Sequence, residues 1–291
     1  NELGETEAEI FFMAYTLDGV ADRAARPLMF SFNGGPGSSS VWLHLGALGP
    51  RRVKMRPDGA MPPPPYQLVD NPHTWLDQTD LVFIDPVGTG YSRASKPDLG
   101  KKFWGVQGDL ESVGEFIRLY LTRYQRWSSP LFLVGESYGT TRAAGLAGYL
   151  VDRGIAFNGI LLVSSILNFE TARFTRGNEL PYSLYLPTYT ATAWYHKRLP
   201  ADLQSRDLKS VLDEGEGWIG GDYARFLALG GDAAREQRTA ALDRLARYTG
   251  LERRYLDLSD LRVPIQNFCK ELMRAERRTV GRLDSRFTGV D

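Results

Sequence analysis

The sequence lacks the features that several large protein classes require. It contains one cysteine, Cys269, in 291 residues, so no disulfide can form within the chain. No apolar run approaches the roughly 18 residues of a membrane-spanning helix, and the first ten residues lack the basic and apolar pattern of a signal peptide. Lys plus Arg and Asp plus Glu number 35 each, so no excess of charge favours nucleic acid or a membrane surface as a partner. We therefore expect a globular chain that binds a smaller ligand.

Metal-ligand patterns are also missing. The sequence has three histidines, and none lies near Cys269 at the spacing of a metal site. Cys269 lies on the apolar side of the segment IQNFCKEL, where a buried structural thiol is the expected role. We therefore expect neither a metal ion nor an organic cofactor.

Apolar runs and helical patterns alternate through the first half of the chain. The runs have the length of buried strands, and the segments between them repeat apolar residues every three or four positions, as amphipathic helices do. The expected strands are residues 9–17, 27–32, 80–85, 131–134 and 159–165, and the expected helices are 106–124 and 138–154. Because parallel strands need crossover helices, this alternation predicts an α/β fold with a mostly parallel sheet covered on both faces.

The pattern changes after Asn168. Residues 181–200 are rich in Tyr and Pro and have no clean period. Residues 201–280 are charged with helical periods, with a stop at Gly250 and a new start near Pro264. We therefore expect residues 1–168 to form the N-terminal part of an α/β core, and residues 169–291 to form a helical cap or insertion.

The segment GESYG, residues 135–139, places Ser137 between two glycines, after an apolar strand and before a helix. This order is that of a nucleophile elbow, in which the serine occupies a strained turn and small neighbours let the backbone approach. A serine with only a packing role is the alternative. The strand and helix on either side favour Ser137 as a nucleophile.

A glycine-rich loop supplies a second signal. The segment FNGGPGSSS, residues 32–40, follows another expected strand. Its glycines leave backbone N–H groups able to point at an anion, as an acyl-transfer enzyme requires opposite its serine. A plain tight turn and a phosphate-binding loop are the alternatives, and the second lacks the Gly-Lys-Ser/Thr ending.

Together with IDPVGTGYS, residues 84–92, these motifs occur in an order and spacing that resemble the serine carboxypeptidases, peptidase family S10, of the α/β-hydrolase fold. The resemblance is close over residues 9–165 and looser in the segment that follows. It implies a serine-type carboxypeptidase, a hydrolase that removes single amino acids from the C-terminus of peptides. The implied partner is a peptide with a free C-terminus, and the implied location is secreted, periplasmic or vacuolar.

The resemblance assigns roles by position. Ser137 is the nucleophile, and the backbone N–H groups of Gly35 and Tyr138 form the oxyanion hole. Asn33 and Glu136 hold the free carboxylate of the substrate. Two ionised carboxylates in contact repel each other, so Glu136 would have to be protonated, and carboxylate binding would weaken as the pH rises.

Three positions depart from the family pattern. Ser31 stands where many members have Trp, Ser38 where they commonly have a disulfide-bonded Cys, and Ala47 where a Glu often pairs with the glutamate of the elbow. Arg51 and Arg52, just beyond, are cationic candidates for the place of that partner. The departures leave an esterase or acyltransferase on the same scaffold as an alternative.

The catalytic acid and base are not evident in this chain. In this fold they follow the nucleophile on loops after later strands. Of His44, His73 and His196, only the last follows Ser137, and no strand precedes it. We therefore expect the catalytic Asp and His outside this chain, on a second chain or a C-terminal segment that completes the fold. A non-catalytic binding protein is the alternative if the chain is complete.

Overall fold

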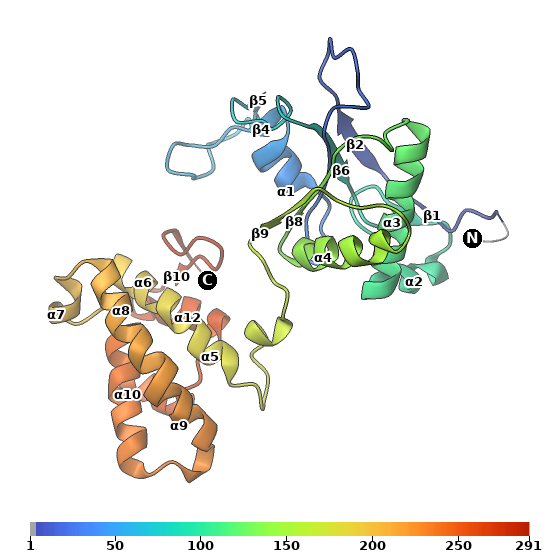
Figure 1. The fold of residues 1–291 in the computed structure, drawn as a ribbon. Coiled ribbons are helices and arrows are strands. Elements are labelled where there is room, and N and C mark those ends of the chain that lie inside the picture. Colours follow the sequence, from blue (N-terminus) through green and yellow to red (C-terminus); the bar gives the residue numbers. More distant parts are fainter. Residues whose placement is uncertain (1–3, 291) are drawn as a thin grey trace. The chain divides into compact units, whose positions relative to one another are not determined.

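The computed structural model describes residues 4–290. The chain divides into two compact units, residues 1–167 and 168–291. Figure 1 colours the first unit from blue to yellow-green and the second from yellow to red. Ser137 and the glycine-rich loop both belong to the first unit.

The first unit contains a five-stranded sheet with the order β2-β6-β3-β8-β9. The strands are β2 (Phe12–Tyr15), β3 (Leu28–Phe32), β6 (Asp80–Ile84), β8 (Leu131–Glu136) and β9 (Gly159–Val163). β2 runs antiparallel to β6, and the other neighbours are parallel. The predicted mostly parallel sheet is therefore confirmed, and each predicted strand overlaps one of these five. Two short pairs lie outside the sheet, β1 (Ala8–Glu9) with β7 (Arg93–Ala94) and β4 (Arg51–Val53) with β5 (Leu68–Asp70).

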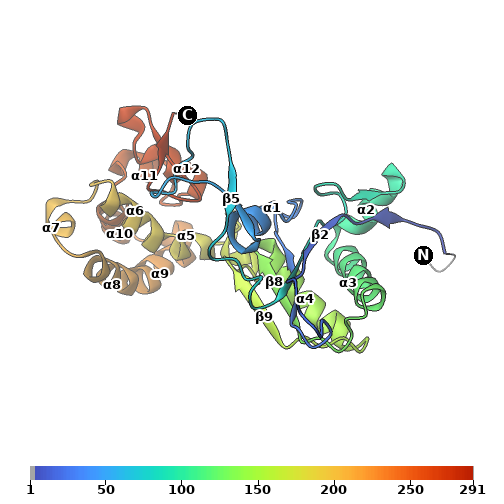
Figure 2. The same ribbon diagram turned by 90° about the horizontal axis from the view of Figure 1, so that it is seen from above.

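Helices cover both faces of this sheet (Figure 2). The first unit contains α1 (Val41–Leu43), the π-helical turn η1 (His44–Leu48), η2 (Pro97–Leu99), α2 (Gly100–Trp104), α3 (Val106–Arg123) and α4 (Tyr138–Val151). Successive residues of a strand point to opposite faces. Phe30 of β3 therefore packs with the side chains of α3 and α4, whereas Met29 packs with Leu43 and Leu48 on the other face. Burial on both faces explains why the inner strands are continuous apolar runs.

The last strand of the sheet, β9, differs from the inner strands. β3 and β6 are buried at every position, but Ile160, Leu162 and Val163 of β9 are 40%, 41% and 39% exposed. Within residues 4–290, β9 pairs with β8 along one side only. In this part of the chain the sheet therefore ends at an apolar edge strand, of the kind that proteins usually cover.

The second unit is helical apart from one pair of two-residue strands among its described residues. Its helices are α5 (Leu180–Leu184), α6 (Leu186–Tyr195), α7 (Ala201–Gln204), α8 (Leu208–Trp218), α9 (Ala224–Leu229), α10 (Arg235–Thr249), α11 (Arg253–Leu258) and α12 (Ile265–Glu271), with short turns η3 (Phe169–Thr171), η4 (Ile219–Tyr223), η5 (Gly230–Asp232) and η6 (Arg274–Glu276) and strands β10 (Thr279–Val280) and β11 (Thr288–Gly289). As predicted, α10 ends at Gly250, which has φ 69°, and Pro264 directly precedes α12. Cys269 is half-buried against the core of this unit, and burial raises the pKa of its thiol.

Residues 181–200 have no helical period in the sequence, yet most of them lie in α5 and α6. Pro181 and Pro187 occupy the first turns of these helices, where a missing N–H removes no helical hydrogen bond. Thr190 and Thr192 are buried, and their hydroxyls donate to carbonyls four residues earlier, at 3.0 and 2.8 Å. Polar residues therefore occupy the buried face of α6, which removes the contrast that a periodic pattern needs.

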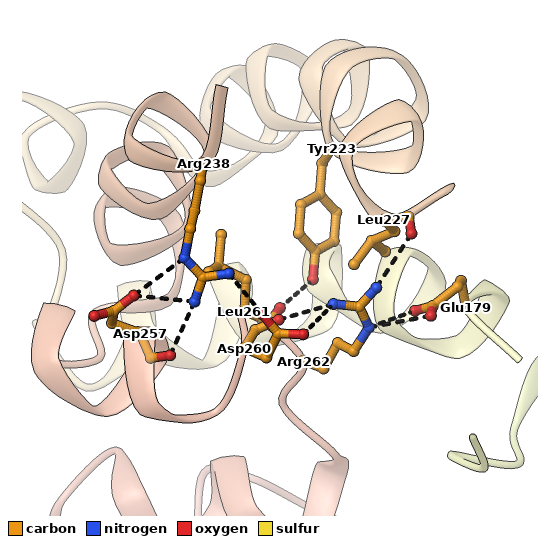
Figure 3. A network of polar contacts seen from close by, with 8 residues as sticks. All are labelled: Glu179, Tyr223, Leu227, Arg238, Asp257, Asp260, Leu261 and Arg262. Carbon is orange, nitrogen blue, oxygen red and sulfur yellow. Dashed lines mark hydrogen bonds and ion pairs between the residues drawn. The ribbon is translucent and has the colours of Figure 1, made fainter. Parts of the chain in front are cut away.

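An arginine network holds the turn between α11 and α12 (Figure 3). Arg262 Nε donates to both carboxylate oxygens of Glu179, at 3.1 and 2.9 Å. Its Nη1 donates to the Asp260 carboxylate at 3.0 Å, and its Nη2 donates to the backbone carbonyl of Leu227 at 3.1 Å. Arg262 therefore ties this turn to the start of α5 and to α9.

The same turn has an unusual backbone. Asp260 and Leu261 have φ angles of 50° and 58°, in the left-handed region that disfavours residues with a side chain. Arg238 binds the carboxylates of Asp260 at 2.5 Å and Asp257 at 3.0 Å. The Tyr223 hydroxyl donates to the Leu261 carbonyl at 2.7 Å. These bonds hold the turn in a conformation that its own residues do not favour.

Arg262→Ala should destabilise the second unit, because it leaves the Glu179 carboxylate without its cation and the turn without its brace. We expect a loss of about 2 kcal/mol, measured by native-state hydrogen exchange over residues 224–258 in the intact protein. Arg254→Ala is the matched control, since Arg254 is an exposed arginine of α11 outside this network, and it should change stability by less than about 0.5 kcal/mol. Equal effects of the two substitutions would contradict a stabilising role of the network.

Candidate active site

Ser137 lies at the carboxyl end of β8, directly before α4. Its backbone has φ 57° and ψ −126°, a conformation that costs a residue with a side chain about 1–3 kcal/mol. The Ser137 N–H donates to the carbonyl of Val163 at 3.0 Å, and the Ser137 carbonyl accepts from the N–H and the hydroxyl of Thr140, at 2.8 and 2.7 Å. This strained and firmly held turn between strand and helix is the geometry of a nucleophile elbow.

The glycines of the elbow are required because three backbone segments meet here. A Cβ on Gly135 would lie 2.0 Å from the carbonyl oxygen of Gly139, and a Cβ on Gly139 would lie 2.8 Å from that of Phe32. Both distances are too short for a carbon and an oxygen that are not bonded. The ends of β8 and β3 and the start of α4 therefore pack backbone against backbone.

The glycine-rich loop leaves β3 beside the start of α4. A Cβ on Gly34 would lie 2.4 Å from the backbone nitrogen of Tyr138, so only glycine fits at this position. Gly35 then turns the loop with φ 107°, which residues with a side chain rarely adopt. The two predicted oxyanion donors, on Gly35 and Tyr138, thus belong to segments that are in contact through Gly34.

Asn33 and Glu136, the predicted carboxylate-binding pair, are in direct contact. Asn33 Nδ2 donates to Glu136 Oε2 at 2.9 Å, and Asn33 Oδ1 accepts from the N–H of Leu43 at 3.0 Å. Asn33 is fully buried, whereas Glu136 is only partly buried. Solvent therefore reaches this pair through Glu136, and the Asn33 amide has its orientation set by Leu43 in α1.

The positions that depart from the family pattern have no polar link to this pair. Ser31 is fully buried in β3, and its hydroxyl has no hydrogen-bond partner among the described residues. Ala47 is exposed in η1. Arg51 pairs with an exposed aspartate of β5 at 3.2 Å, and the buried Nε of Arg52 has no partner within residues 4–290. Neither arginine binds Glu136 in the described part of the chain.

The motif at residues 84–92 connects the loop after β6 to the glycine-rich loop. The buried carboxylate of Asp85 accepts from the N–H of Ser40 at 2.9 Å. Gly90 lies so close that a Cβ on it would be 1.9 Å from Asp85 Oδ2. The Ser92 hydroxyl donates to the Asp85 carbonyl at 2.6 Å and accepts from the N–H of Phe11 at 2.8 Å. The glycine-rich loop is therefore held at its far end as well.

A buried ion pair beside the site was not predicted from the sequence. Arg142 of α4 and Asp109 of α3 are 2% and 6% exposed, and Arg142 Nε donates to the two Asp109 oxygens at 3.0 and 2.8 Å. The sequence does contain a signal for it. Asp109 precedes the buried Val113 by four residues, and Arg142 precedes the buried Leu146 by four, so each charge lies on the buried stripe of its helix.

His44 is half-buried in a structural setting on the other face of the sheet. Its Nε2 lies 2.7 Å from the hydroxyl of Tyr15, and its ring stacks on Phe83 with centroids 4.5 Å apart. Burial lowers the pKa of His44, and the negative charge of Asp85 opposes this shift. The imidazole is therefore neutral at neutral pH.

The other two histidines lie in other surroundings. His196 Nε2 is 2.6 Å from the backbone carbonyl of Ser285 within the second unit, which makes this nitrogen the donor. His73 is exposed in the loop after β5. Within residues 4–167, neither His44 nor His73 forms a hydrogen bond with Ser137 Oγ.

The residues gathered at this site are one serine, one amide, one carboxyl group and backbone N–H groups. Over residues 4–290 the structure brings together no group of three or more His, Cys, Asp or Glu side chains that could hold a metal ion. No helix in that part of the chain is both long and apolar enough to cross a membrane.

Comparison with known proteins identifies the family of this chain. The description of peptidase family S10, serine carboxypeptidase, matches residues 2–209, which is more than half of the chain. The chain belongs to the serine carboxypeptidase family. The family match and the sheet with helices on both faces together confirm the predicted α/β-hydrolase fold.

This serine carboxypeptidase family member has relatives in plants and fungi. It is 31% identical over 166 residues to serine carboxypeptidase-like 36 of Arabidopsis thaliana, and the aligned region covers 55% of this chain and 32% of that protein. It is 34% identical over 148 residues to the pheromone-processing carboxypeptidase KEX1 of Saccharomyces cerevisiae, and the aligned region covers 47% of this chain and 19% of that protein. The chain thus spans about a third of the length of the first relative and less of the second.

A solved structure is also similar to this serine carboxypeptidase family member. It is the crystal structure of Kex1(Δ)p, a prohormone-processing carboxypeptidase from Saccharomyces cerevisiae, with 22% sequence identity and a TM-score of 0.48. The alignment covers 87% of this chain and 50% of that chain.

Gly139→Ala should disrupt the elbow, because the added Cβ would collide with the Phe32 carbonyl. We expect a stability loss of about 3 kcal/mol, at the upper end of the cost of overpacking, measured by urea unfolding. Gly148→Ala, in the same helix, is the matched control, since its Cβ would meet nothing within 4 Å. It should stabilise the helix by up to about 1 kcal/mol, and a similar loss in both variants would contradict a special role of Gly139.

Proposed function

We propose that this chain carries the nucleophile and the oxyanion-binding groups of a serine-type carboxypeptidase. The enzyme releases C-terminal amino acids from peptides through an acyl-enzyme on Ser137. The observation that carries the proposal is the strained backbone of Ser137, which Val163 and Thr140 hold beside the glycine-rich loop. Backbone strain persists only where the surroundings impose it, and it is typical of functional sites. Membership of the serine carboxypeptidase family favours peptide hydrolysis at a free C-terminus.

The proposed reaction has two steps. A histidine, oriented by an aspartate, takes the proton of the Ser137 hydroxyl while Oγ bonds to the last peptide carbonyl carbon. The oxyanion accepts from the N–H groups of Gly35 and Tyr138, and loss of one such donor typically costs about 10²- to 10³-fold in rate. The C–N bond then breaks, and the leaving amine takes the proton from the imidazole. Water cleaves the resulting ester in the second step and restores Ser137.

We assign the catalytic aspartate and histidine to a second chain or a C-terminal segment that extends the sheet at β9. The outer side of β9 has no strand partner within residues 4–290, and Ile160, Leu162 and Val163 of this strand are about two-fifths exposed. An apolar edge strand is a template for another strand. We also propose that the complete enzyme is secreted, periplasmic or vacuolar and that its substrates are peptides.

The recognition of the substrate carboxylate falls to Glu136 in this proposal. Glu136 is the partly exposed member of the pair, and the buried Asn33 amide donates to it. A protonated Glu136 can donate a hydrogen bond to the substrate carboxylate, whereas an ionised one repels it. Asn33 then serves chiefly to orient Glu136.

The first test compares two substrates of the complete protein, a blocked dipeptide with a free C-terminal carboxylate and the corresponding amide. We expect kcat/KM for the free acid to be about 10- to 100-fold higher, because a hydrogen bond to a charged group contributes about 1.5–3 kcal/mol. Ser137→Ala should abolish both reactions and also labelling by a fluorophosphonate. Equal rates would favour an esterase or acyltransferase, and a wild-type protein without labelling at Ser137 would favour a binding protein.

The second test removes the Glu136 side chain in the complete protein. Glu136→Ala leaves the substrate carboxylate without its proposed donor, so KM for the free acid should rise by about 10- to 100-fold, whereas KM for the amide should change by less than about 2-fold. Glu111→Ala is the control, because Glu111 is an exposed acid of α3, and it should leave both KM values unchanged. An equal change of KM for the free acid and for the amide in Glu136→Ala would contradict a role of Glu136 in binding the carboxylate.

An esterase or acyltransferase on the same scaffold is the second candidate. It is favoured by Ala47, whose exposed methyl group cannot act as the acid that pairs with the elbow glutamate in other family members. Such an enzyme keeps the same nucleophile and oxyanion donors, because the acyl-enzyme chemistry is shared.

A further inference from the structure

The buried guanidinium of Arg142 contacts both predicted oxyanion segments. Its Nη1 donates to the backbone carbonyl of Asn33 at 2.8 Å, while its Nε is occupied by Asp109. That carbonyl belongs to the peptide bond that joins Asn33 to Gly34, the residue packed against the Tyr138 nitrogen. Arg142 therefore holds the glycine-rich loop at the point where it leaves β3.

Arg142 also holds the residue that follows the nucleophile. Its guanidinium carbon lies 5.2 Å from the ring centres of both Phe32 and Tyr138, which is within the range of cation–π attraction. The Tyr138 hydroxyl hydrogen-bonds to Asp109, and burial together with the Asp109 charge raises the pKa of this phenol. Arg142 therefore contacts the ring of Tyr138, and Asp109 binds its hydroxyl.

Packing alone does not require a charged pair at this place. Removing a guanidinium and a carboxylate from water is costly, and apolar side chains of similar size often stabilise a core at least as well. The fork of an arginine offers what apolar residues lack, namely donors at fixed angles that can bind a carboxylate and a carbonyl together. Arg142 binds both kinds of acceptor, the carboxylate of Asp109 on α3 and the backbone carbonyl of Asn33 at the end of β3.

We propose that Arg142, oriented by Asp109, is the positioning residue for the oxyanion site, because it sets the distance between the glycine-rich loop and the start of α4. The inference rests on the proposed function for its chemical meaning. Arg142 does not touch the substrate in this scheme. It acts through the Asn33–Gly34 peptide and through Tyr138, and its loss displaces one N–H donor relative to the other.

The test compares Arg142→Lys with Arg126→Lys in the complete protein. Lysine keeps the positive charge but has no fork, so it cannot bind Asp109 and the Asn33 carbonyl with the same geometry. Arg126 is a matched control, because it is 4% exposed and binds a buried carboxylate, Asp80, at 2.7 Å and a backbone carbonyl at 2.8 Å. Asp80 begins β6, at the amino end of the parallel strands, whereas Ser137 follows the carboxyl end of β8.

Two measurements decide the outcome. Hydrogen exchange of residues 33–40 should become about 10-fold faster in Arg142→Lys and should stay within about 2-fold of wild type in Arg126→Lys, since loss of a bond loosens only the segment that it holds. Labelling of Ser137 by a fluorophosphonate should slow by about 10- to 100-fold in Arg142→Lys only, which is at or below the loss of a whole oxyanion donor. Unchanged loop exchange in Arg142→Lys, or equal slowing of labelling in both variants, would overturn the proposal.

The positioning role and the proposed function can fail separately. If the wild-type protein releases no C-terminal amino acid, the carboxypeptidase proposal fails, yet labelling and loop exchange still decide the role of Arg142 because neither needs a peptide. If the wild-type protein is not labelled either, loop exchange alone decides it. If Arg142→Lys does not fold, Asp109→Asn keeps the size of the side chain and should give the same pattern, with Asp80→Asn as its control.

Discussion

The direct packing of three backbone segments around Ser137 is the constraint on which the first unit depends. The end of β3, the end of β8 and the start of α4 approach so closely that a Cβ on Gly34, Gly135 or Gly139 would collide with backbone atoms. Because β3 and β8 pair in parallel, their carboxyl ends lie side by side, and this brings the three segments together. The strained turn at Ser137 exists because this packing and its hydrogen bonds leave it no alternative.

Buried arginines lie at both ends of the parallel strands of this sheet. At the amino ends, Arg126 binds Asp80 and a backbone carbonyl. At the carboxyl ends, Arg142 binds Asp109 and the carbonyl of Asn33. The chemistry is alike, since a guanidinium can satisfy a carboxylate and a carbonyl at once. The two arginines differ in what they hold, because the loop and the helix start that flank the serine lie only at the carboxyl ends of the strands.

The second unit is stabilised by different means. Its mainly aliphatic core includes a stacked aromatic pair, Tyr189 and Phe268, with ring centroids 4.0 Å apart. The left-handed turn at residues 260–261 contains no glycine, so ion pairs and carbonyl bonds from Arg238, Arg262 and Tyr223 hold it instead (Figure 3). The family match ends at residue 209, so this turn and the three residues that hold it lie beyond the match.

The sequence by itself determined the alternation of strands and helices, the place of Ser137 between a strand and a helix, and the family, because these follow from local periods and short motifs. Only the tertiary structure decided that Asn33 is buried against Glu136, 103 residues away, and that Asp109 and Arg142 meet. It also decided that residues 186–195 are helical despite their buried threonines. The physical reason is the same in each case: a local pattern reports the conformation of its own segment, whereas the burial and the partner of a polar side chain depend on which distant segments the fold packs against it.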